Sequence, residues 1–61
     1  IRLYTKDYCP YCILAKNLLE NIGAEYQEID VTDDFAKMME ISQKSRMRTV
    51  PQIFIDDEPL G

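Results

Sequence analysis

The apolar residues of the N-terminal half change period twice, and this pattern constrains the fold more than any other feature. Residues 1–5 alternate with period two, as in a strand. From Pro10 the apolar residues recur at helical spacing as far as Gly23, which is the predicted C′ residue. Residues 24–31 alternate again. A strand, a helix and a strand in so short a stretch predict a βαβ unit with parallel strands and a right-handed crossover.

The same periods predict which residues of this unit face its core. In the first strand, Ile1 and Leu3 share one face. The apolar stripe of the helix consists of Leu14, Leu18 and Ile22, widened by Ala15 and Leu19, and its outward face consists of Lys16, Asn17, Glu20 and Asn21. In the second strand, one face carries Gln27, Ile29 and Val31, and the other carries Tyr26 and Glu28.

A second predicted helix follows the βαβ unit. Thr32, Asp33 or Asp34 can cap its N-terminus, and it ends near Lys44 or Ser45. Its apolar stripe consists of Phe35, Met38, Met39, Ile41 and Ser42. Methionines on such a stripe are usually core residues, and we interpret them so.

The last part of the chain predicts a loop and a hairpin. Residues 46–50 form the loop, and strand 51–55 then alternates Ile53 and Ile55 against Gln52 and Phe54. Residues 56–57, both aspartates, form a turn, and a returning strand begins at Glu58.

The only two cysteines, Cys9 and Cys12, are three residues apart where the first helix begins. At that spacing both lie on one helix face, so their sulfurs can form a disulfide. Pro10 suits the first helical position. At the helix N-terminus the Cys9 thiol should have a lowered pKa and act as the nucleophile, because unpaired N–H groups and the helix dipole favour an anion there. The less exposed Cys12 should keep its proton longer and react second.

Two other uses of the cysteine pair are weaker. A structural zinc ion needs four ligands, and a chain with two cysteines and no histidine would need a second chain to supply them. A purely structural disulfide over so short a loop would contribute little stability. We therefore expect a redox dithiol and no metal. It lies beyond the carboxyl end of the first strand, where open α/β sheets place their chemistry.

Length and charge limit the remaining possibilities. The 61 residues predict a single domain spanning 1–61, and the net charge of −4 argues against a nucleic-acid partner. No apolar run is long enough for a membrane span and no signal peptide is visible, although one could have been removed before Ile1. We expect a cytoplasmic protein. Lys44, Arg46 and Arg48 form a short basic segment, either a solvated helix end or a seat for a small anion.

Three features together resemble the glutaredoxin family. They are the motif Cys9-Pro10-Tyr11-Cys12 after a strand, Lys6 three residues before it, and Thr49-Val50-Pro51 at the third strand. The resemblance covers essentially the whole chain. It implies an α/β, thioredoxin-like fold with a mixed sheet in the order 2-1-3-4, flanking helices, and only the first two strands parallel. Family members continue with a second glycine, a polar turn and a final helix, so the chain resembles the family core without that helix.

The resemblance also implies a function and a binding site. It implies a glutathione-dependent thiol–disulfide oxidoreductase that reduces protein disulfides and glutathione mixed disulfides, with Cys9 attacking and Cys12 resolving. A cis Pro51 would leave the Val50 backbone free to pair with glutathione as a short added strand. The predicted glutathione-binding residues are Lys6, Tyr11, Arg48, Thr49, Val50 and Pro51, with Lys6 and the basic segment meeting the carboxylates. Tyr11 would cover one side of the sulfur, or else be a merely exposed aromatic. We expect the complete protein to be a monomer.

Two alternatives stay open within this resemblance. The same fold could receive its electrons from a thioredoxin reductase, as glutaredoxin-like thioredoxin substitutes do. A binding module could instead hold an iron–sulfur cluster between two subunits through Cys9 and external glutathione. Lys6 and Tyr11 favour glutathione coupling over the first, and Pro10 and Cys12 make the second less favourable.

Overall fold

A computed structural model describes residues 1–7 and 9–60. Its elements in chain order are β1 (Arg2–Thr5), α1 (Pro10–Asn21), β2 (Gln27–Asp30), α2 (Phe35–Ser45), β3 (Gln52–Ile55) and β4 (Glu58–Pro59). All six predicted elements are present, and β2 is shorter than the predicted range 24–31. Position 8 in the connection before the cysteines, and the final Gly61, lie outside the described residues.

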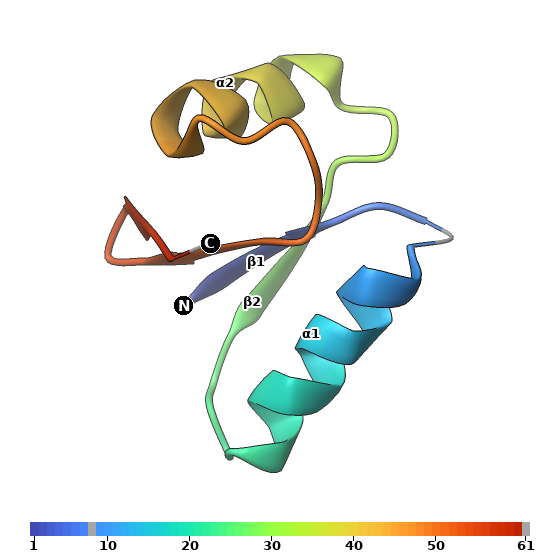
Figure 1. Cartoon of the computed structure of the whole chain (residues 1–61), viewed down its shortest axis with the longest axis vertical. Helices are drawn as coiled ribbons and strands as arrows, with labels where there is room; N and C mark the ends of the chain where they lie inside the picture. The colour runs from blue at the N-terminus through green and yellow to red at the C-terminus, as the bar shows by residue number, and fades with distance from the viewer. Residues whose placement is uncertain (8, 61) are drawn as a thin grey trace.

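The four strands form one mixed sheet in the order β2-β1-β3-β4. β1 pairs with β2 in parallel, whereas β3 is antiparallel to both β1 and β4. This arrangement confirms the predicted sheet order and the predicted strand directions. Figure 1 shows α1 and α2 on opposite sides of the sheet, so each helix covers one face. Among the described residues, no helix is long and apolar enough to cross a membrane.

The ends of both helices have capping interactions that the sequence indicates. Asp34 is the N-cap of α2 and accepts the Lys37 backbone N–H at 3.0 Å, and Arg46, in the left-handed region with φ 62°, is the C-cap. After α1, Gly23 has φ 71°. The backbone N–H groups of Gly23 and Ala24 donate to carbonyls in the last turn of the helix, as in a Schellman motif. Gly23 is therefore the C′ residue, as predicted.

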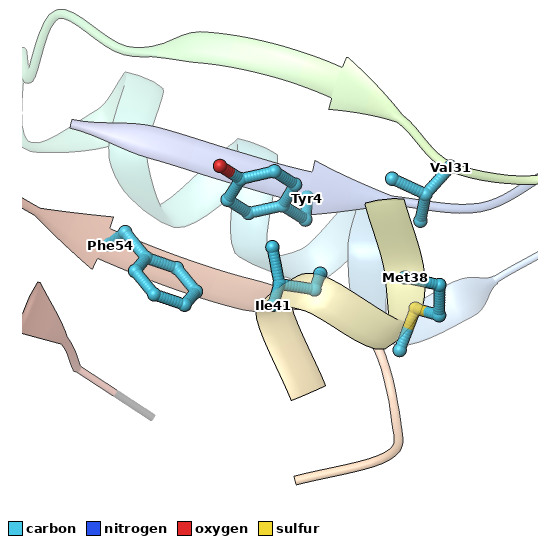
Figure 2. Packing of buried hydrophobic residues seen from close by; sticks show 5 residues of the cluster. All are labelled: Tyr4, Val31, Met38, Ile41 and Phe54. Carbon is cyan, nitrogen blue, oxygen red and sulfur yellow. The ribbon is translucent and has the colours of Figure 1, made fainter. Parts of the chain in front are cut away.

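The main hydrophobic core lies between the sheet and α2. It consists of Tyr4, Val31, Met38, Ile41 and Phe54, shown together in Figure 2. The rings of Tyr4 and Phe54 come from neighbouring strands and meet edge to face, with centroids 5.3 Å apart. On the opposite face of the sheet, Leu3 is fully buried. Alternate residues of β1 and β3 therefore point to opposite faces of the sheet, as predicted, and both faces are covered by a helix.

The predicted apolar stripe of α1 is wrong in its orientation. Leu14, Leu18 and Ile22 are 60%, 58% and 68% exposed, while Cys12 and Leu19 are the buried residues of the helix. Cys12 and Leu19 are seven residues apart, so they lie on one face two turns from each other. Lys16, predicted to point outward, is half-buried on that side and pairs with Glu28 of β2 at 3.2 Å.

The apolar stripe of α2 is narrower than predicted. Met38 and Ile41 are buried, which confirms Met38 as a core residue. Phe35 and Met39 are 76% and 47% exposed, and their apolar surfaces are therefore open to solvent. They lie beside the buried Met38 and Ile41 on the same helix, so α2 has an exposed apolar surface that borders the core.

Candidate active site

Cys9 is the N-cap residue of α1, and its atoms accept hydrogen bonds from the first turn of the helix. Its carbonyl oxygen accepts the backbone N–H of Cys12 at 3.1 Å and that of Ile13 at 3.2 Å. The Cys9 Sγ also accepts the Cys12 N–H, at 3.3 Å. Pro10 follows as the first helical residue, where it has no N–H to leave unpaired. The Cys9 sulfur therefore lies at the N-terminus of α1, as predicted.

The two thiols differ in acidity. A hydrogen bond from the Cys12 side chain is the largest cause that lowers the pKa of Cys9, and the backbone N–H groups of Cys12 and Tyr11 lower it further. Burial raises the pKa of Cys12 to about 11, and its hydrogen bond with Cys9 raises it too. Cys12 is 2% exposed, whereas Cys9 is half-buried. Cys9 is thus the thiol that ionises first and is accessible.

Val50 and Pro51 directly precede β3, and the Val50 carbonyl lies close to Cys9. The peptide bond between them is cis. The ladder between β1 and β3 ends with the pair Tyr4 and Gln52, so both residues lie beyond it. The Val50 carbonyl is not free in the dithiol state, because the Cys9 Sγ lies 3.8 Å from it and is oriented to donate. A thiolate has no proton to donate, so ionisation of Cys9 releases this carbonyl.

Gln52 holds the loop before Val50, and sequence reasoning missed this role. Its side chain is 1% exposed, and Nε2 donates to the carbonyls of Met47 at 3.0 Å and Thr49 at 2.9 Å. Ser45 Oγ donates to Gln52 Oε1 at 2.8 Å. One signal was available: Gln52 shares its strand face with Phe54, so a buried amide in need of partners could have been inferred.

The loop after β1 is tied to the loop after β2. The backbone N–H of Asp7 donates to Thr32 Oγ1 at 2.8 Å, and the Thr32 N–H donates to an Asp30 carboxylate oxygen at 2.8 Å. The Thr32 side chain is the largest cause that lowers the pKa of Asp30, and the Thr32 backbone N–H lowers it further. This network holds Asp7, the residue after Lys6, against the loop that follows β2.

The predicted cations divide into two groups. Lys6 and Arg48 line one groove of about 920 Å³, and Arg46 lines it as well. Lys44 is not among its lining residues and pairs with Glu40 on α2 at 3.9 Å. The basic segment is therefore not a single surface, because only its last two cations face the groove that Lys6 shares.

The other predicted binding residues have different positions. Tyr11 lies in the first turn of α1 rather than on a loop, and its side chain is 71% exposed. Thr49 is exposed as well, and its carbonyl is held by Gln52. Within residues 1–7 and 9–60 there is no cluster of three or more His, Cys, Asp or Glu side chains that could hold a metal ion.

Comparisons with known proteins agree on one family. The glutaredoxin family model matches residues 1–60. Glutaredoxin 3 of Escherichia coli K12 is 44% identical over 61 residues, covering 100% of this chain and 74% of that protein. The Pseudomonas aeruginosa glutaredoxin is 41% identical over 59 residues, covering 97% of this chain and 70% of its own length.

A solved structure gives the same assignment. The crystal structure of a buckwheat glutaredoxin–glutathione complex superposes with a TM-score of 0.88 at 35% identity, covering 98% of this chain. The chain spans 57% of the length of that protein. The sheet order, the cysteine pair at the start of α1 and these matches have one explanation: the chain belongs to the glutaredoxin family.

Proposed function

We propose that this protein is a glutathione-dependent thiol–disulfide oxidoreductase that reduces glutathione mixed disulfides and protein disulfides. One observation carries the proposal: the Cys9 sulfur accepts the Cys12 N–H at the N-terminus of α1 and has a lowered pKa, with a second thiol one helical turn away. A dithiol in this arrangement is suited to attack a disulfide and then to release its product.

The first step is attack by the Cys9 thiolate on a disulfide sulfur of the substrate. A bond forms between the Cys9 Sγ and that sulfur while the substrate S–S bond breaks, and the leaving thiolate takes a proton from water. With a glutathione mixed disulfide, Cys9 becomes glutathionylated. The thiolate of a second glutathione then attacks the glutathione sulfur, which gives glutathione disulfide and restores the Cys9 thiolate.

Protein disulfides need Cys12 for release. After attack, Cys9 is joined to the substrate and carries no charge, so its hydrogen bond and its charge no longer raise the pKa of Cys12. Cys12 then loses its proton and attacks the Cys9 sulfur. The Cys9–Cys12 disulfide forms, the substrate leaves as a dithiol, and two glutathione molecules reduce the disulfide again.

Most of the residues proposed to bind glutathione come from the segments that precede α1 and β3. The Val50 backbone lies beyond the sheet ladder and is suited to pair with the extended tripeptide. Lys6 and Arg48 supply positive charge in one groove for its carboxylates. The buckwheat relative is described as a glutaredoxin–glutathione complex, which supports this ligand. Tyr11, Thr49 and Pro51 complete the proposed site.

One assay tests the proposal. The small mixed disulfide of glutathione and 2-mercaptoethanol is offered with glutathione, glutathione reductase and NADPH, and NADPH consumption is followed. We expect turnover that Cys9→Ser abolishes. Turnover with thioredoxin reductase in place of glutathione and its reductase would instead support the thioredoxin-like alternative. A brown protein with visible charge-transfer absorption would support the cluster-binding alternative. A cytoplasmic location stays a prediction.

A further inference from the structure

The groove that contains Lys6 and Arg48 runs along the whole of α2. The lining from α2 and its C-cap consists of side chains at helical spacing: Phe35, Met38, Met39, Ser42, Gln43 and Arg46. The rest of the lining consists of Lys6, Arg48 and the residues that follow β2, Val31, Thr32 and Asp33. The groove is thus much longer than a seat for one carboxylate.

The cations of this groove differ from the other basic residues of the chain. Arg2, Lys16, Lys37 and Lys44 each form an ion pair with a carboxylate. Among the described residues, Lys6, Arg46 and Arg48 form none, although the chain has 11 acidic residues. All three line the groove, which holds a single carboxylate, Asp33. The three basic side chains without an ion pair among the described residues therefore lie together in this groove, although the protein is acidic overall. Their charge favours the binding of an anion.

The groove is also apolar. Val31 and Met38 form its base and belong to the buried core, where Figure 2 shows them at the end away from Phe54. Phe35, 76% exposed, and Met39, 47% exposed, present apolar surface at its edge. Exposed aromatic and methionine side chains are typical of surfaces that bind peptides. The groove therefore suits a partner with acidic and large apolar side chains together.

Two residues that line the groove are close in sequence to the reactive sulfur or to the residue beside it. Lys6 precedes Cys9 by three residues. Arg48 precedes Val50 by two, and the Val50 carbonyl lies 3.8 Å from the Cys9 Sγ. Val50 also packs against the core cluster that contains the base of the groove, Val31 and Met38. Three residues span at most about 11 Å, so a polypeptide whose sulfur is at Cys9 can reach the groove within a few residues.

We propose that this groove binds the polypeptide of a protein substrate, selecting disulfides that are flanked by acidic and large apolar residues. The inference rests on the proposed function and specifies its substrate class. The apolar side chain packs on Phe35 and Met39. A carboxylate pairs with Arg46 at the C-terminal end of α2, beyond the site of glutathione itself.

A binding experiment tests the groove without any redox step. The probe is a fluorescein-labelled peptide with the sequence Glu-Leu-Glu on each side of a central serine, and fluorescence anisotropy gives its Kd for the reduced full-length protein. Matched peptides replace each glutamate by lysine or each leucine by serine. We expect the acidic, apolar peptide to bind about tenfold more tightly than either. Equal Kd values for the three peptides would overturn the proposal.

Matched variants locate the binding. Arg46→Gln should weaken the acidic peptide by about threefold to tenfold, whereas Lys44→Gln, which removes the same charge two residues away, should change it by less than about twofold. Phe35→Ser should weaken it similarly, and Leu18→Ser, at another exposed apolar position, on α1, should not. A loss of equal size in Lys44→Gln and Arg46→Gln would show a general charge effect and would also overturn the proposal.

Kinetics separate this inference from the proposed function. With peptides that contain a disulfide, Phe35→Ser should lower kcat/KM for the acidic, apolar peptide only, and should leave the small mixed disulfide unaffected. If the protein does not turn over the small mixed disulfide but Arg46→Gln and Phe35→Ser still weaken peptide binding, the proposed function is wrong and the proposed peptide site is supported. If sedimentation shows self-association that Phe35→Ser abolishes, a second copy occupies the groove and the inference is wrong.

Discussion

The hydroxyl of Ser45 donates to Gln52 Oε1 at 2.8 Å and so joins the last residue of α2 to the first residue of β3. The loop between them contains Arg48, Thr49 and Val50. The two hydrogen bonds from Gln52 Nε2 hold this loop from inside, at the Met47 and Thr49 carbonyls. The loop therefore has a fixed shape before any ligand binds.

Gln52→Glu should destabilise the protein and weaken the site. The glutamate keeps the shape but cannot donate to both carbonyls, and it buries a carboxylate beside them. We expect the free energy of unfolding to fall by about 2 kcal/mol or more, measured by urea denaturation. The KM for glutathionylated substrates should rise as the loop loosens. Gln27→Glu, at an exposed position of β2, is the control. An unchanged urea midpoint in Gln52→Glu would refute the role of this amide.

Cys12 should control the acidity of Cys9 through its side chain. Because the Cys12 side chain is the largest cause of the lowered Cys9 pKa, Cys12→Ala should raise that pKa. Cys12→Ser keeps a donor and should raise it less. The rate of iodoacetamide alkylation at Cys9, followed by mass spectrometry across pH, measures the pKa. Equal values in the two variants would assign the effect to the backbone N–H groups instead.

The sign of the pH dependence follows from the two shifts. The Cys9 pKa is lowered, so its thiolate persists to lower pH than that of an ordinary cysteine, and alkylation should slow only as the pH falls through the lowered pKa. Alkylation of Cys12 should stay negligible at neutral pH and begin only toward its pKa of about 11. Alkylation of both thiols at similar rates near pH 7 would contradict the assignment.

The order of elements could be predicted from the sequence because it depends on period and on short signals. Asp34 caps the start of α2 and Gly23 follows the end of α1, both through local hydrogen bonds that short sequence signals indicate. The sequence predicts Gly23 directly, and Asp34 is one of three candidate caps. The rotation of α1 could not be predicted in this way. Its exposed leucines are as apolar as a core stripe, and only tertiary packing selects the face with Cys12 and Leu19.

The site was predictable where chemistry resides in adjacent residues, and not where distant segments meet. The cysteine pair and its helix position follow from the motif itself. The division of the basic segment does not, because Lys44 and Arg46 are two residues apart and yet only Arg46 faces the groove. That division depends on where α2 ends, at the left-handed Arg46, which turns the chain away from the helix axis.

Gly23→Ala should cost about 1 kcal/mol of stability, because an L-residue is strained at φ 71° although nothing within 4 Å would meet the added methyl group. Thermal unfolding should show the loss. Gly23→Asn is the control, since asparagine tolerates the left-handed region better and should lose less. If alanine and asparagine lower the melting temperature equally, backbone strain is not the reason for glycine at this position.

The two cysteines should have separable roles. Cys9→Ser should lose all activity. Cys12→Ser should keep the reduction of glutathione mixed disulfides and lose the reduction of protein disulfides, which needs a resolving thiol. The assays are NADPH consumption with the mixed disulfide of 2-mercaptoethanol and the reduction of insulin disulfides. A Cys12→Ser variant that fails equally with both substrates would show that this division of labour is wrong.

The charges of Lys6 and Arg48 should act on substrate binding and not on the chemical step. Lys6→Gln or Arg48→Gln should raise the KM for a glutathione mixed disulfide by about twofold to fivefold, the size of one exposed ion pair, with kcat nearly unchanged. Lys44→Gln is the matched control, since its ammonium pairs with Glu40 and lies outside the groove. In about 1 M salt the Debye length is near 3 Å, so the differences in KM should shrink. A fall in kcat in Lys6→Gln that salt does not alter would place this lysine in the chemical step, in conflict with the geometry.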